Sequence, residues 1–155
     1  MIMDAESSLS LLDRLVGTWT TEATHPAVPG TLVHGTAEIE WLEGERFLIV
    51  RSRTDHADFP DSISIIGFTD SDRVPVSSDA RISMQYFDSR GVFRKLDVAI
   101  DATAWRIERL APGFSQRFVG TFVDGGDAID GRWQLCEDDV HWNDDLQITY
   151  RRKRD

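Results

Sequence analysis

After Gly17 the apolar residues of this chain recur at every second position, in short segments that end at clusters of Gly, Pro, Asp and Ser. Side chains on an extended strand point alternately to its two sides, so this spacing keeps the apolar set on one face of a sheet. Asp-Ser-Arg-Gly at 88–91 suits a tight hairpin, because Gly91 can adopt a positive φ, and another turn is predicted at 70–72. The predicted strands run over 17–24, 33–42, 46–55, 62–69, 80–87, 92–101, 103–110, 115–122, 128–137 and 144–152.

About ten short strands joined by hairpins form a meander with two free edges. Open edges carry unpaired backbone groups that invite aggregation, and a long twisted sheet curls. We therefore predict an all-β fold, a closed up-and-down antiparallel barrel that forms a single domain over residues 1–155. A barrel of this size is wide enough to leave space for a small ligand.

The residues before Gly17 follow a helical period instead. Apolar positions spaced 8–12–15–16 predict a short N-terminal helix at about 8–16. Ser7 or Ser8 is suited to cap its start, and Gly17 to end it. We expect this helix to plug one end of the barrel.

Alternation also predicts which side chains face the interior. The segment 46–55 is ambiguous, because Phe47 and Arg51 lie on one side, Leu48 and Val50 lie on the other, and both sides begin apolar and turn polar. We assign the side with Phe47 and Arg51 to the interior. The predicted ligand-binding set, which would line a pocket or fill a core, is Trp41, Phe47, Arg51, Met84, Tyr86, Leu96, Trp105, Phe118, Trp133 and Tyr150.

Several arginines lie on the same side of their predicted strands as the apolar residues, namely Arg94, Arg109 and Arg152. Arg51 joins them if the side of 46–55 that carries Phe47 faces the interior. An arginine inside a barrel must be paired or hydrated, and it could hold a ligand carboxylate through a bidentate pair. The alternative is that these side chains lie at the barrel ends and reach solvent.

Composition excludes several classes of function. The net charge of −10 and pI of about 4.7 argue against nucleic acid as a partner. No apolar stretch approaches the roughly 18 residues that span a membrane.

The single cysteine fits a reducing compartment, and the acidic N-terminus is unlike a signal peptide, so we expect a cytoplasmic protein. The spacing of the four histidines predicts no metal site, and no catalytic motif is present.

The segment Gly17–Thr18–Trp19 after a short helix, with arginines on the last strand, resembles the calycin superfamily of lipocalins and fatty-acid-binding proteins. The resemblance implies that Trp19 closes one barrel end, with Arg151 or Arg152 over its ring. The wider pattern looks like a bacterial calycin-like family of unknown function. Its matching pieces are Pro29–Gly30, 42–48, 86–91, Gly131–Arg132–Trp133, Trp142, Asp145–Leu146 and 150–152.

The chain is also distantly similar to the nitrobindin family, whose haem iron is held by a histidine near the start of the last strand. Here that stretch reads Asn143–Asp144–Asp145–Leu146, so we expect no cofactor, and His141 keeps haem or nitric-oxide binding as a minor alternative. The leading hypothesis is a module that binds a small hydrophobic or amphipathic molecule inside the barrel. An isomerase-like enzyme that uses the barrel as a dry chamber, with Tyr86, an arginine or an aspartate as an acid–base group, is the main alternative. A homodimer is left open.

Overall fold

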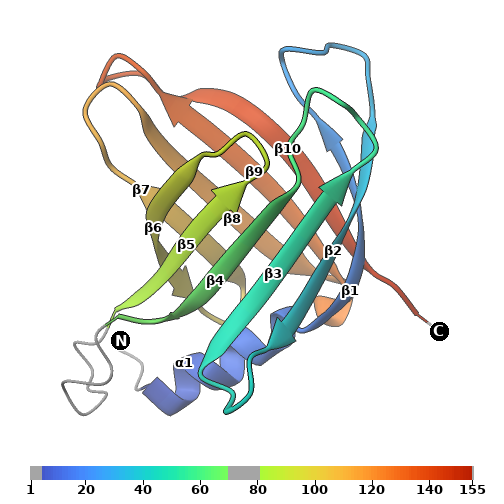
Figure 1. Cartoon of the computed structure of the whole chain (residues 1–155), viewed down its shortest axis with the longest axis vertical. Helices are drawn as coiled ribbons and strands as arrows, with labels where there is room; N and C mark the ends of the chain where they lie inside the picture. The colour runs from blue at the N-terminus through green and yellow to red at the C-terminus, as the bar shows by residue number, and fades with distance from the viewer. Residues whose placement is uncertain (1–4, 70–80, 155) are drawn as a thin grey trace.

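A computed structural model describes residues 5–69 and 81–154, and in it ten antiparallel strands close into one barrel (Figure 1). Each strand pairs with its neighbours in the chain, and β1 pairs with β10 to complete the circle. The predicted fold class is therefore confirmed. The strands are β1 (Gly17–Thr24), β2 (Val33–Trp41), β3 (Phe47–Thr54), β4 (Ser62–Phe68), β5 (Ile82–Asp88), β6 (Phe93–Ile100), β7 (Ala104–Arg109), β8 (Ser115–Val123), β9 (Ala128–Cys136) and β10 (Asn143–Arg152).

The observed strand ends fall within two residues of the predicted ones. Residue 80, at the start of the fifth predicted strand, and the turn predicted at 70–72 lie outside the described residues. Along β1, Trp19, Thr21 and Ala23 are buried while the residues between them are exposed. This strict alternation fixes the register, because a slip of one residue would turn the apolar set to solvent.

The N-terminal helix, α1 (Ala5–Leu12), begins earlier than predicted and continues as a 3-10 turn, η1 (Asp13–Leu15). Ser7 and Ser8 therefore lie inside α1, and the prediction that one of them caps the helix is wrong. The apolar stripe, not the serines, determines where the helix lies, because Leu12 and Leu15 are fully buried. Figure 1 shows α1 across one end of the barrel. Among the described residues, no helix is both long and apolar enough to cross a membrane.

At this closed end, Trp19 is fully buried and its indole N–H donates to the Leu15 carbonyl at 2.9 Å. The guanidinium of Arg152 lies 4.3 Å from the centre of the Trp19 ring. It also donates to the carbonyls of Arg14, at 2.8 Å, and Val16. Arg152 thus ties η1 to the last strand, while its neighbour Arg151 is exposed.

Candidate ligand-binding site

The interior of the barrel is the candidate site. The pairing of neighbouring strands shows which residues of each strand face this interior. Eight residues of the predicted set occupy inner positions: Trp41, Met84, Tyr86, Leu96, Trp105, Phe118, Trp133 and Tyr150. Trp41 lies at the closed end, where its indole N–H donates to Asp13 at 2.8 Å, so it belongs to the floor.

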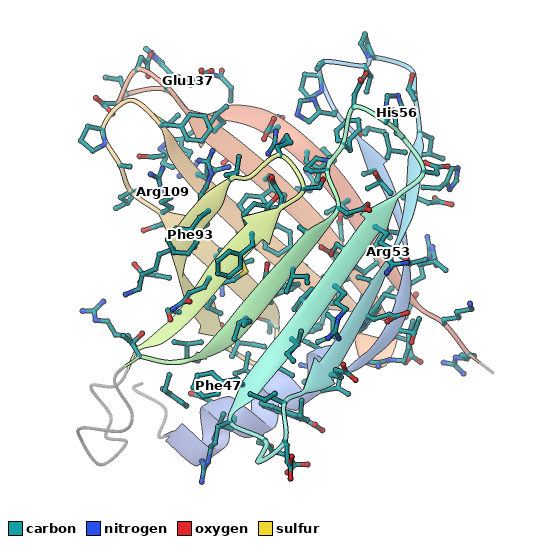
Figure 2. The ribbon with its side chains drawn as sticks, viewed as in Figure 1. Phe47, Arg53, His56, Phe93, Arg109 and Glu137 are labelled. Carbon is teal, nitrogen blue, oxygen red and sulfur yellow. The ribbon has the colours of Figure 1, made fainter. Side chains whose placement is uncertain are left out.

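Phe47 and Arg51 lie on the outer face, and their assignment to the interior is wrong. Arg51 forms an ion pair at 2.6 Å with Glu40, which is exposed. Phe47 covers Gly67 on the outside of the barrel, and Figure 2 shows it near the lower end of β3. The inner residues of β3 are Leu48 and Val50, which are buried. Both sides of β3 are apolar near its start, so alternation alone could not decide between them.

The lower half of the interior is filled by close-packed side chains. Phe118, Ile107 and Leu96 are at most 4% exposed, and Ile129 is fully buried. Aromatic rings form a continuous series from the floor upward. Their centroids are 6.4 Å apart for Trp19–Tyr150, 6.2 Å for Tyr150–Trp105, 5.2 Å for Trp105–Phe118 and 5.0 Å for Phe118–Trp133.

A hollow remains along β9 and β10. Leu135, Trp133, Ile148 and Tyr150 occupy inner positions, yet each keeps accessible surface. An inward side chain of a closed barrel that remains accessible borders unfilled space, so the packing of the interior is incomplete at these four positions. Burial raises the pKa of the Tyr150 phenol to about 12.

Two half-buried arginines line the upper end of this interior, on β6 and β7. Arg94 donates to the Gln116 side chain at 3.4 Å and lies over the Phe114 ring at 4.6 Å. Arg109 donates to the Phe114 carbonyl at 2.8 Å and faces Gln116 across the β7–β8 pair. Figure 2 marks Arg109 at this end of the barrel. Both arginines lie on the interior side of their strands and near the barrel end, so the two readings of them meet here; none of Arg94, Arg109, Gln116 and Phe114 was in the predicted ligand-binding set.

Neither arginine has an acidic partner within 4 Å in the described part of the chain. This is unexpected on composition, because 27 acidic residues face 17 basic ones in the sequence. Arg51, Arg90 and Arg152 each pair with a carboxylate, whereas the half-buried Arg14 and Arg117 have none within 4 Å among the described residues either. Half-buried charge without a counter-charge is unfavourable, so Arg94 and Arg109 form a cationic corner whose charges are not compensated by a described carboxylate.

The inner wall on the other side of β5 from this corner carries hydroxyl groups. Ser52 and Thr54 on β3, with Ser62 and Ser64 on β4, occupy inner positions near the upper rim. The open end is thus polar on one side and apolar along β9 and β10. In the sequence, Ser52 and Thr54 lie on the same side of the strand as Leu48 and Val50. This places them in the interior only once it is known which side of β3 faces inward.

Tyr86, the proposed acid–base group, is engaged in a hydrogen-bond network. Its hydroxyl donates to Asp88 at 2.8 Å, and Arg90 pairs with the same carboxylate at 2.7 Å. The hydrogen bonds from Arg90 lower the pKa of Asp88 strongly, and burial, followed by the bond to Asp88, raises the pKa of Tyr86 to about 12. The phenol therefore stays protonated at neutral pH with its proton directed at Asp88, which suits a structural brace between β5 and the following turn.

Each of the four histidines contacts a neighbouring polar or aromatic group. His25 accepts from the Ala27 N–H at 3.0 Å through Nδ1 and contacts Asp145 at 2.8 Å through Nε2, so both ring nitrogens are engaged. His34 lies on the outer face and His141 is 75% exposed and bound to Asp138. His56 packs edge-on against Phe59 in the loop after β3.

The structure was also searched for pockets on the outside of the barrel and for metal sites. An open groove of about 460 Å³ crosses the rim near the start of β4, beside Arg51, Ile63 and Phe87. The part of the chain that the structure describes holds no group of three or more potential metal-ligating side chains.

Comparison with known proteins identifies the fold. No family model matches the chain, and no curated protein matches it. The crystal structure of Rv2717c from M. tuberculosis superposes with a TM-score of 0.64 at 15% identity, over 95% of this chain and 98% of that one. The S-type phycobiliprotein lyase CPES from Guillardia theta gives 0.52 at 11% identity, over 99% and 94%. EF1p2_mFAP2b, whose structure is bound to DFHBI, gives 0.49 at 10% identity, over 94% and 99%. The first two establish that the chain shares a barrel fold with those proteins, which fits a calycin-like barrel.

Proposed function

We propose that this protein binds a small amphipathic molecule with an acidic head group inside the barrel. The head lies at the open end between Arg94, Arg109 and Gln116, and the apolar body extends down the hollow toward Tyr150. The observation that carries the proposal is the pair of half-buried arginines that lack a carboxylate partner in a chain rich in carboxylates.

The chemistry of the corner favours an anion over a neutral polar group. Two guanidinium groups from adjacent strands present planar donors that match the two oxygens of a carboxylate. Gln116 already accepts from Arg94, so its amide N–H₂ is left to donate toward the same anion. A neutral head group would leave both charges uncompensated.

The hollow limits the length of the ligand. Leu135 pairs with Gln116 at the level of the arginines, and Ile129 pairs with Tyr150 at the lower end. These levels are about 20 Å apart along a strand, or about 15 Å along the axis of a tilted barrel. A medium-length chain or an aromatic acid fits that depth, and the aromatic rings of Trp133 and Phe118 offer it a flat apolar wall.

The experiment compares dodecanoate with dodecanol, which differ only at the head, by native mass spectrometry and by quenching of tryptophan fluorescence. We expect dodecanoate to bind at least tenfold more tightly. Arg94→Met and Arg109→Met should each weaken dodecanoate binding by about 10- to 100-fold, the effect of losing one hydrogen-bonded charge. They should leave dodecanol unchanged.

Arg132→Met is the matched control, because Arg132 lies on the outer face of β9 and is 70% exposed. It should bind dodecanoate like the parent protein. Equal affinity for the acid and the alcohol, or arginine variants that behave like Arg132→Met, would contradict the proposed head-group site. Failure of dodecanoate, dodecanol and an aromatic acid of similar length to bind at all would refute the binding function itself.

A further inference from the structure

The lower half of the interior holds a polar group that the proposed function does not use. Trp105 is only 3% exposed, and its indole N–H is buried without a hydrogen-bond partner among the described residues. The rings beside it, Phe118 and Tyr150, lie 5.2 Å and 6.2 Å away between centroids, and the face of an aromatic ring is a weak acceptor. A buried donor that lacks a partner costs free energy, so this N–H calls for an acceptor that the described chain does not supply.

Two hydroxyl groups of the same region are also without a partner. The Tyr150 phenol and the Thr21 hydroxyl form no hydrogen bond within residues 5–69 and 81–154. Tyr150 and Thr21 lie directly opposite each other on the inner faces of β10 and β1, and Thr21 is 7% exposed. Since most buried polar side chains are hydrogen-bonded, three unpartnered groups around one ring indicate that a polar atom from outside the chain belongs there.

Tyr150 borders space that is separated from bulk water. Its side chain keeps accessible surface, yet burial raises the pKa of the phenol to about 12. A group that is both accessible and desolvated faces an enclosed gap. Ile148, the next inner residue of β10 toward the open end, keeps accessible surface too, so the incomplete packing is not confined to Tyr150.

We propose that the ligand of the barrel carries a carbonyl oxygen in its apolar body, and that the Trp105 indole and the Tyr150 phenol donate hydrogen bonds to it. This inference rests on the proposed function and specifies its ligand class, which is an oxo acid and not a plain fatty acid. The acidic head lies at Arg94 and Arg109, and the carbonyl lies at the buried donors below them.

The chemistry of the donors selects a carbonyl group. An indole N–H only donates, so the ligand atom that meets it must be an acceptor. A carbonyl oxygen has two lone pairs and can accept from the indole and the phenol together. The three unpartnered groups are uncharged, so they would not offset the cost of burying a second carboxylate.

The strand register gives the depth of this distal site. Trp105 pairs with Gly120, and Gln116, at the level of the arginines, lies four residues away on the same strand. The two levels are about 13 Å apart along the strand, or about 10 Å along the axis of a tilted barrel. The carbonyl group therefore belongs in the distal part of a medium-length chain.

The test compares dodecanoate with 7-, 9- and 11-oxododecanoate by isothermal titration calorimetry, so that the ketone samples several depths. We expect at least one oxo acid to bind the parent protein about 5- to 10-fold more tightly than dodecanoate, the effect of hydrogen bonds between uncharged groups. Trp105→Phe should remove this preference, and Tyr150→Phe should reduce it. In the infrared spectrum, the C=O stretch of the bound ketone should lie at lower frequency in the parent protein than in Trp105→Phe.

Trp133→Phe is the matched control, because Trp133 is another inner tryptophan and contacts the same Phe118 ring. It should change the affinity for dodecanoate and the oxo acid alike. Arg94→Met should weaken both acids and leave their ratio unchanged, which separates the head-group site from the distal site. Circular dichroism verifies the fold of each variant, and Tyr150→Phe, which removes a single oxygen atom, decides the test if Trp105→Phe does not fold.

The outcomes distinguish this inference from the proposed function. If dodecanoate binds but the parent protein prefers no oxo acid, or if the preference survives in Trp105→Phe, the distal site is refuted while the head-group site stands. If none of the four acids binds, both proposals are overturned.

Discussion

Replacing Arg152 with methionine measures how much one side chain contributes to the closed end of the barrel. The guanidinium donates to two carbonyls at the end of η1, lies over Trp19 and pairs with Asp127 at 3.3 Å. Methionine keeps the apolar stem and loses these contacts. Two charge-assisted hydrogen bonds contribute about 1.5–3 kcal/mol each when a partner is left buried, and the cation–π contact adds about 1 kcal/mol.

We therefore expect Arg152→Met to lower the free energy of unfolding by about 4 kcal/mol and the Tm by roughly 8–16 °C in a chain of this size. Urea denaturation followed by tryptophan fluorescence measures this, with an unchanged slope showing that the barrel still unfolds as one unit. Arg151→Met changes an exposed residue on the other face of the same strand and should stay within about 0.5 kcal/mol of the parent.

Arg152→Lys separates charge from geometry. A lysine ammonium keeps the positive charge, but it cannot present the planar fork that reaches two carbonyls at once, so we expect about half of the loss seen for methionine. The reasoning would be refuted if Arg152→Met and Arg151→Met differed by less than about 1 kcal/mol, the value of a single ordinary hydrogen bond.

Two further predictions concern side chains of the interior, and a third concerns the turn between β6 and β7. The indole N–H of Trp105 is the buried side-chain donor without a partner among the described residues, so Trp105→Phe should cost at least about 1 kcal/mol less in urea denaturation than Trp19→Phe, which breaks a real hydrogen bond. Tyr86 and Tyr150, the two tyrosines of the chain, have pKa values raised to about 12 in the folded protein. Their contribution to stability is therefore present below pH 10 and is lost as the pH rises from 10 to 12. Absorbance at 295 nm should show little phenolate at pH 10.5 until urea unfolds the protein. Hydroxyl and backbone hydrogen bonds from the turn that Asp101 caps lower its pKa to about 2, so its contribution is complete above about pH 4 and is lost as the pH falls toward 2, and D101N should flatten that part of the stability profile.

The strands could be predicted from sequence because their signals are local. Alternation, together with turn residues such as Gly91, places every strand end within two residues. The start of α1 was predicted wrongly because two serines offered a capping signal that the structure does not use. Parity also placed Arg94 and Arg109 on the inner wall. What parity could not show is that they lack acidic partners, since pairing depends on which strands lie side by side.

The error at β3 has a physical origin that β4 shares. A strand with one solvated face alternates cleanly, whereas a strand covered on both faces is apolar on both. Phe47 and Ile49 make the outer side of β3 apolar, and Ile63 and Ile65 do the same on β4. Alternation failed to assign β3 at the point where the outer surface is least suited to water.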